Sequence, residues 1–150
     1  MENMKVLERL KSREAIKFSS KHMVSFAEVD PFGHMNSQHY LSYYNAHRFE
    51  GNQKLINLSL REISKWPIIF PISEITIKYI KPLFAGDEFE IESYISSVND
   101  TSCEIFMEIK KNQNIISQAN ATYVCVDKAT GTRSSWPDDT IERFFLKKEE

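Results

Sequence analysis

Hydrophobic and polar residues alternate over the middle and C-terminal parts of the chain, which predicts β-strands there. In the first three stretches the apolar side chains share one face and charged side chains occupy the other. The last stretch places small side chains on one face, which suits close packing against a helix. Turn-forming residues separate the stretches, so they are expected to form consecutive hairpins of an antiparallel sheet. The four predicted strands are residues 75–79, 88–95, 103–110 and 115–126.

An earlier strand is predicted from Lys21 to Asp30, where Val24 and Phe26 fall on one face of a loosely alternating segment. It ends in Asp30-Pro31-Phe32-Gly33, a strong turn signal. The first strand therefore leads directly into a tight turn at Asp30.

The next segment has the pattern of a long helix. It is expected to begin at Asn36 or Ser37, either of which can cap it, and to run to about residue 54. A small residue on its packing face lets a helix approach a sheet closely. The residues that recur on one face are Tyr40, Tyr44, His47 and Gly51.

These elements predict a single α+β domain over residues 1–150, in which one long helix covers a five-stranded antiparallel sheet. The core is expected to span about residues 21–137. Residues 1–20 are interpreted as an N-terminal extension and 137–146 as a short C-terminal helix, whereas 55–66 is ambiguous. Because the edges of the sheet need cover, a homodimer or homotetramer is expected.

Composition narrows the possible functions. The 150 residues include 19 Lys and Arg against 21 Asp and Glu, a net charge of -2, which argues against a nucleic-acid partner. No apolar run is long enough to predict a membrane span. Cys103 and Cys125 form no CxxC pattern, and the four histidines show no zinc-binding spacing, so a cytoplasmic protein without a metal is expected. The chain has only four glycines, where average usage gives roughly ten.

The segment from Asp30 to Leu41 carries a family resemblance. It is similar to the signature of the hot-dog-fold acyl thioesterases. Hydroxybenzoyl-coenzyme A thioesterases and their acyl-CoA relatives show an aspartate, a Pro or Ala, a Gly, and later Asn-Tyr or Asn-Phe. Acyl-carrier-protein thioesterases show an aspartate followed by His-Val-Asn-Asn-x-x-Tyr. The residues that match the second pattern are Asp30, His34, Asn36 and Tyr40.

The chain also departs from these patterns. Ser37 replaces the second Asn, Met35 replaces Val, and His39 stands where the first branch has Asn. The resemblance extends over about residues 21–137. It implies a hot-dog fold and hydrolysis of an acyl-CoA thioester to free acid and CoA, with no cofactor beyond the CoA of the substrate. Two alternatives stay open: an acyl-ACP thioesterase, and a hot-dog protein that binds an acyl thioester without hydrolysing it.

The residues themselves fit this chemistry. Thioester hydrolysis needs a nucleophile or general base and a donor for the developing oxyanion. The resemblance implies that Asp30 attacks the carbonyl or activates a water, and that the amide near Ser37 binds the thioester oxygen at the positive end of the helix. The neighbouring residues expected to position the thioester are Asn36, His34 and Gly33.

Each candidate also has a structural interpretation. Asp30 can be only a turn residue, Asn36 only a helix cap, and His34 only a loop histidine. Tyr40 and Tyr44 are candidates for the substrate pocket but are also typical core aromatics. Glu50 is an alternative catalytic carboxylate. The competing interpretation of Glu50 is an ion pair with Arg48 or Lys54.

The sequence gives only a weak indication of the residues that bind the coenzyme A part of the substrate. The phosphates of coenzyme A favour Arg, Lys or a helix N-terminus. The side chains at or near strand ends that could contact CoA are Lys78, Lys81, Lys128 and Arg133.

Overall fold

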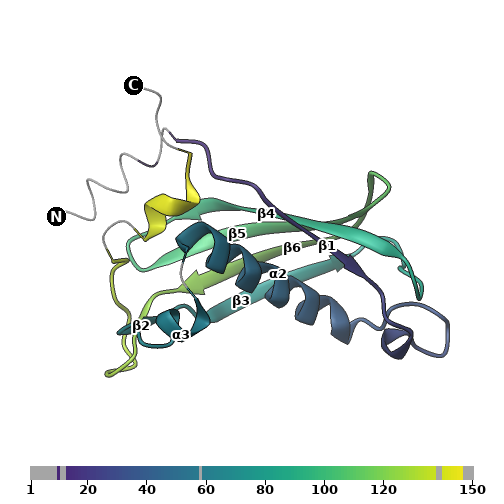
Figure 1. Cartoon of the computed structure of the whole chain (residues 1–150), viewed down its shortest axis with the longest axis horizontal. Helices are drawn as coiled ribbons and strands as arrows, with labels where there is room; N and C mark the ends of the chain where they lie inside the picture. Colours follow the sequence, from purple (N-terminus) through teal and green to yellow (C-terminus); the bar gives the residue numbers. More distant parts are fainter. Residues whose placement is uncertain (1–9, 11–12, 58, 138–139, 147–150) are drawn as a thin grey trace.

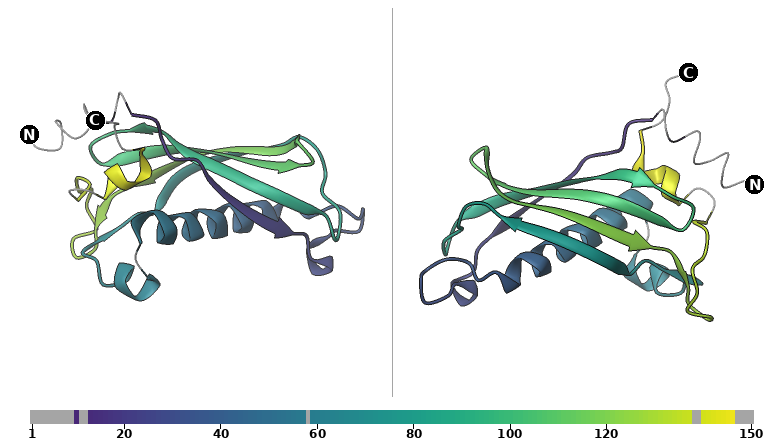
Figure 2. Two further views of the ribbon diagram at one scale, coloured as in Figure 1. Left: turned by 45° about the horizontal axis from the view of Figure 1, so that its top comes forward. Right: turned by 180° about the vertical axis from the view of Figure 1, so that it is seen from behind.

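The computed structural model describes residues 10, 13–57, 59–137 and 140–146. A five-stranded antiparallel sheet forms the body, and one long helix, α2 (Gln38–Ile56), lies across one face of it (Figures 1 and 2). This arrangement confirms the predicted α+β fold. The strands, in their order across the sheet, are β1 (Phe18–Met23), β4 (Glu88–Val98), β5 (Ser102–Lys111), β6 (Asn114–Val124) and β3 (Ile72–Tyr79).

Helix α2 covers the sheet through the face that the sequence pattern identifies. Tyr40, Tyr44, His47 and Gly51 are all buried. At Gly51 the backbone comes so close to the sheet that an added Cβ would lie 2.7 Å from Cδ1 of Phe18 on β1. The glycine therefore sets how closely the helix can approach β1.

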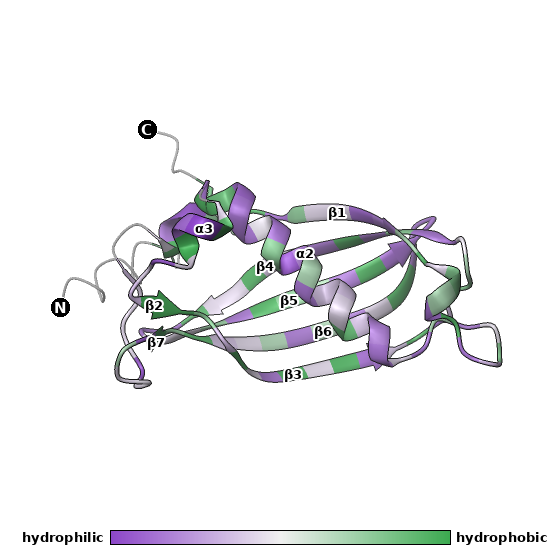
Figure 3. Ribbon diagram, turned by 60° about the horizontal axis from the view of Figure 1, so that its bottom comes forward, coloured by the Kyte–Doolittle hydropathy of each residue, from purple (hydrophilic) through white to green (hydrophobic). Residues whose placement is uncertain are grey.

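The core-facing side of the sheet follows the predicted alternation, which Figure 3 shows along the strands beneath α2. Phe89, Ile91 and Ile95 of β4 are buried, whereas the intervening Glu88 and Glu90 are exposed. Small side chains on β6 make room for the helix. These fully buried residues are Ser117, Ala119 and Ala121.

The prediction of consecutive hairpins is wrong for the first pair of strands. β3 and β4 follow each other in the chain but lie on opposite sides of the β5–β6 hairpin, and β3 pairs with β6. The connection 80–87 instead crosses the end of the sheet. Its fully buried Leu83 accepts a hydrogen bond from the Met35 amide at 2.7 Å. The connection is therefore part of the wall beside the start of α2.

The first strand is displaced from its predicted position. β1 spans Phe18–Met23, and the predicted residues beyond it form a 3-10 helix, η1 (Phe26–Glu28). Ser25 and Glu28 form a capping box at the start of η1, which ends the extended conformation. The alternation of Val24 and Phe26 is therefore not that of a strand, and Phe26 is 84% exposed.

The remaining elements lie at the end of the sheet that is far from the start of α2. Helix α3 (Leu60–Ile63) falls in the ambiguous region, and β2 (Ile68–Ile69) pairs with β7 (Val126–Asp127). The predicted C-terminal helix is shorter, a 3-10 helix η2 (Ile141–Phe144).

No helix within the described ranges is long and apolar enough to cross a membrane. Most of the predicted N-terminal extension lies outside the described residues, but Leu10 is buried in the core.

Candidate active site

Segment 30–37 joins η1 to α2 and forms a turn that is held together by hydrogen bonds to Asp30. The Asp30 amide donates to the His34 carbonyl at 2.8 Å, and the Gly33 amide donates to the Asp30 carbonyl at 2.9 Å. Oδ1 of Asp30 accepts from the amides of Phe32 at 2.9 Å and His34 at 3.2 Å. Gly33 has φ +85°, which non-glycine residues disfavour. Asp30 thus organises the turn through one carboxylate oxygen, while Oδ2 has no hydrogen-bond partner in the described part of the chain.

The end of this segment is fixed to two neighbouring elements. The Asn36 amide donates to the Glu28 carbonyl at 2.8 Å, and the buried Met35 is bound to the 80–87 connection. The Asn36 side chain accepts from the Gln38 amide at 3.3 Å. Asn36 is therefore the side chain that caps the helix, whereas Ser37 makes no side-chain cap bond.

The first turn of α2 leaves one amide available. His39 and Tyr40 donate back to the carbonyls of Asn36 and Ser37, and Tyr79 at the end of β3 donates its hydroxyl to the Ser37 carbonyl at 3.2 Å. The Ser37 amide donates to no group among the described residues. It lies at the positive end of the helix dipole, where a free N–H group suits a developing oxyanion.

The other predicted residues surround this turn at different depths. His34 is exposed and its ring meets that of Phe84 edge-on, with centroids 5.0 Å apart. Tyr40 is buried against Tyr79. Tyr44 is fully buried and donates its hydroxyl to Ser117 at 2.8 Å, and burial raises the pKa of its phenol. Tyr40 and Tyr44 thus lie beneath the helix, and their role in a substrate pocket stays a prediction.

The four candidate CoA contacts divide into two groups. Lys78 and Lys81 are exposed at the end of β3 that lies beside the start of α2. Lys128, which donates to the Ser64 carbonyl, and Arg133 lie at the opposite end of the sheet beside β7. β3 alone spans about 25 Å, so one copy of the chain does not present all four to a single CoA.

A family model described as "Thioesterase-like superfamily" matches residues 24–144. This range contains the turn at Asp30, helix α2 and the entire sheet except β1. The chain belongs to the thioesterase-like superfamily.

Similar proteins fall into two groups. A 1,4-dihydroxy-2-naphthoyl-CoA hydrolase of Nostoc punctiforme is 20% identical over 128 residues, which cover 85% of this chain and 86% of the relative. A chloroplastic acyl-acyl carrier protein thioesterase of Arabidopsis thaliana is 31% identical over 102 residues, 67% of this chain and 54% of the relative.

Solved structures share the fold. A Staphylococcus aureus protein whose structure is a complex with CoA has a TM-score of 0.79 and 18% identity, and the match covers 88% of this chain and 84% of that one. The hot-dog fold expected from the resemblance is thereby confirmed.

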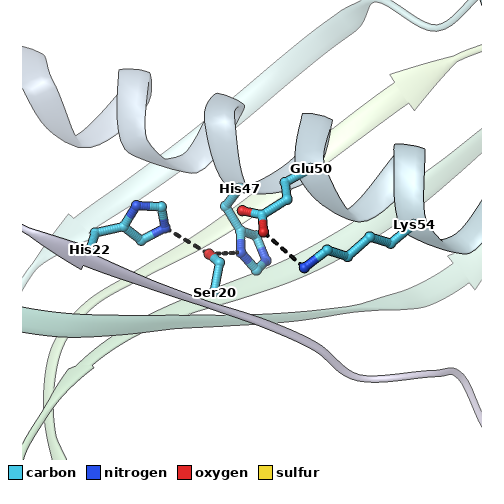
Figure 4. Close-up of polar contacts among 5 residues, drawn as sticks. All are labelled: Ser20, His22, His47, Glu50 and Lys54. Carbon is cyan, nitrogen blue, oxygen red and sulfur yellow. Dashed lines mark hydrogen bonds and ion pairs between the residues drawn. The ribbon is translucent and has the colours of Figure 1, made fainter. Parts of the chain in front are cut away.

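This thioesterase-like chain also contains a polar network that the sequence analysis missed. Ser20 on β1 lies between two imidazoles, with its Oγ 2.7 Å from His22 Nε2 and 2.6 Å from His47 Nδ1 (Figure 4). The other nitrogen of His47 lies 2.6 Å from Ser93 Oγ, to which Arg48 also donates. The one available signal was a histidine on the core face of a predicted helix, because a buried imidazole needs hydrogen-bond partners.

The network does not have the properties of a second catalytic centre. Burial, and then the nearby charge of Arg48, lower the pKa of His47 to about 3, so the imidazole is neutral. Its second nitrogen is bound to a serine and not to the carboxylate that orients the base in a catalytic triad. Ser20 is only 6% exposed. The network therefore satisfies polar groups inside the core.

Glu50 lies one turn beyond His47 and forms an ion pair with Lys54, with 3.0 Å between Oε1 and Nζ (Figure 4). This is one of the two pairings expected from the sequence. Arg48, the other expected partner, is buried in the core instead. Among the residues described, no cluster of three or more His, Cys, Asp or Glu side chains is placed to hold a metal ion.

Proposed function

We propose that the chain hydrolyses an aryl- or acyl-CoA thioester to the free acid and CoA at segment 30–37. The observation that carries the proposal is the pairing of two groups on one closed turn. These are the Asp30 carboxylate, whose Oδ2 has no hydrogen-bond partner among the described residues, and the Ser37 amide at the start of α2. A base or nucleophile and an oxyanion donor are the two requirements of thioester hydrolysis.

In this mechanism the thioester oxygen accepts a hydrogen bond from the Ser37 amide, and the helix dipole stabilises the negative charge that develops on it. Asp30 acts in one of two ways. Its carboxylate attacks the carbonyl carbon and expels the CoA thiolate, leaving an anhydride that water hydrolyses. Alternatively, it removes a proton from a water molecule that attacks the carbonyl. Both routes release the acid and the thiol.

The first substrate to test is 1,4-dihydroxy-2-naphthoyl-CoA. Support comes from the Nostoc punctiforme hydrolase, which matches over most of both chains, and from a structural neighbour that binds CoA. The exposed aromatic rings of Phe32 and Phe84 beside the turn offer an apolar surface to an aromatic acyl group.

The second candidate is an acyl-carrier-protein thioester, suggested by the Arabidopsis relative and by the His34-x-Asn36 spacing. A carrier protein needs a basic docking surface. The outward face of β4 instead exposes Glu88 and Glu90, so this face is not a basic docking surface.

The experiment is a thiol-release assay. Purified protein is given 1,4-dihydroxy-2-naphthoyl-CoA, a series of aliphatic and aromatic acyl-CoA thioesters, and matched acyl-ACP thioesters. Release of free CoA from at least one CoA thioester supports the proposal, and release from ACP thioesters alone supports the second candidate. Binding of acyl-CoA without turnover of any thioester identifies the third alternative, an acyl-thioester-binding protein, and contradicts the enzyme.

A further inference from the structure

Arg48 is a buried cation whose polar contacts are all neutral. Its side chain leaves α2 toward the core and is 4% exposed. Nη1 donates to Ser93 Oγ at 3.0 Å, Nη2 donates to Asn52 Oδ1 at 3.3 Å, and the guanidinium lies 5.8 Å from the ring centre of Phe144. The Nε–H group is fully buried and has no hydrogen-bond partner among the residues that the structure describes. Nε is thus the one guanidinium nitrogen that makes no hydrogen bond with the described residues.

The charge of Arg48 also has no carboxylate partner in the part of the chain that the structure describes. The acidic groups that interact with this charge are the Tyr123 phenol and the Cys103 thiol. Burial raises the pKa of Cys103 to about 12 and raises that of Tyr123 as well, so both are neutral at pH 7. Because a guanidinium does not lose its proton at neutral pH, a full positive charge remains in an apolar region, which is costly without a counter-charge.

The same side chain lines a small cavity. The cavity lies between the second half of α2, strands β4 to β6 and η2, and its volume is about 30 Å³. Phe70 and Trp136 contribute apolar walls, and Tyr123 also lines the cavity. A cavity of this size holds one or two water molecules or a single small ion.

We propose that this cavity binds one small monovalent anion, a halide or a short carboxylate such as formate, which pairs with the Arg48 guanidinium. The anion accepts a hydrogen bond from Nε and supplies a counter-charge that the described residues do not provide. Most of the lining side chains are apolar, so the ion pair is stronger there than at the surface. The volume excludes sulfate and other larger anions. Arg48 lies about 15 Å along the helix from Gln38, so this site is separate from the turn at Asp30.

The test is the thermal stability of the full-length protein in different sodium salts at equal ionic strength. Chloride and formate are compared with sulfate and gluconate, which are too large for the cavity. We expect a saturable rise in Tm of about 5 °C or more at a hundredfold excess of the bound anion over its Kd. The chloride and formate series distinguish a halide site from a carboxylate site.

Two variants give the specificity of the effect. Arg48→Met removes the cation and should abolish the difference between small and large anions. Lys54→Met removes an exposed cation from the same helix and should keep the difference. Equal Tm values in all four salts, or an undiminished difference in Arg48→Met, would overturn the proposal.

A second measurement covers the case in which Arg48→Met does not fold. The ³⁵Cl NMR line of the wild-type protein should show excess broadening that saturates and that formate displaces, and Lys54→Met should behave identically. Absence of such displaceable broadening contradicts a halide site. If formate also fails to raise Tm above the value in gluconate, the anion site is excluded.

Discussion

The hydroxyl of Tyr79 donates a hydrogen bond to the carbonyl oxygen of Ser37 at 3.2 Å. This bond joins the last residue of β3 to the residue immediately before α2. The ring of Tyr79 also meets Tyr40 edge-on, with centroids 4.9 Å apart. Ser37, the residue whose amide is the candidate oxyanion donor, is therefore held next to the edge of the sheet through its carbonyl.

Tyr79→Phe tests whether this contact positions the helix start. The variant keeps the ring contact and loses one exposed hydrogen bond, so the free energy of unfolding should fall by no more than ~1 kcal/mol. If the contact positions the Ser37 amide, kcat for thioester hydrolysis should fall about three- to tenfold with little change in KM. Tyr94→Phe on β4, remote from the turn, is the matched control. A Tyr79→Phe variant with wild-type kcat would show that the contact is only structural.

Gly51→Ala tests how closely α2 packs on β1. Alanine favours a helix over glycine by about 1 kcal/mol, but the new Cβ would lie 2.7 Å from Cδ1 of Phe18. We expect the steric cost to exceed the gain and the variant to lose about 1–3 kcal/mol in urea unfolding. Asn45→Ala, on the exposed side of the same helix, should be neutral or slightly stabilising. A Gly51→Ala variant more stable than the wild type would show that Phe18 and β1 can move away from the helix at little energetic cost.

Much of the fold could be predicted from the sequence because its periodicities are clear. β4 and β5 alternate over most of their length, and the face of α2 that carries Tyr40 and Tyr44 is buried as predicted. The first strand could not be placed, because Ser20 points a polar side chain into the core to bind His47. This contact hides the alternation of β1. The pairing of β3 with β6 is a long-range contact that no turn signal reports.

The candidate site was accessible to sequence reasoning only in part. The turn at Asp30 and the capping role of Asn36 follow from residue type and spacing. The role of Tyr79 does not, because it depends on β3 and α2 meeting in space. The burial of Arg48 could not be predicted for the same reason, and the sequence instead suggested an ion pair with Glu50. Whether a helical side chain points to solvent or into the core depends on which side of the helix the sheet covers.

The buried His47 predicts that the protein loses stability in mild acid. Its pKa of about 3 in the folded chain lies below the unfolded value near 6.5. The unfolded state therefore binds more protons between these values, so this stabilisation is complete above pH 6.5 and decreases as the pH falls. The slope approaches 1.36 kcal/mol per pH unit. His22, whose pKa burial also lowers, acts in the same direction.

The measurement is urea unfolding of the wild type and His47→Gln at several pH values between 5 and 7. The difference in slope between the two proteins isolates His47 from His22 and the carboxylates. The stability of His47→Gln should depend less on pH in this range. Equal slopes would mean that His47 is protonated in the folded state or that it opens to solvent.

The edge of the sheet predicts self-association. Among the described strands β3 pairs only with β6, so no described strand covers its outer edge, and Phe32 and Phe84 are exposed. Such edges and apolar rings are normally covered. Light scattering at micromolar concentration should give twice or four times the chain mass of 17.5 kDa. A mass near 17.5 kDa would contradict this prediction.

The most direct test of the proposed mechanism is kcat/KM of Asp30→Asn on a CoA thioester that the wild type hydrolyses. The asparagine carbonyl can still accept the amide bonds of Phe32 and His34, so the turn and the Tm should be retained. The negative charge is lost, and kcat/KM should fall by about 10²–10⁴-fold. A folded Asp30→Asn variant with wild-type kcat/KM would contradict the central claim that the Asp30 carboxylate performs the chemistry.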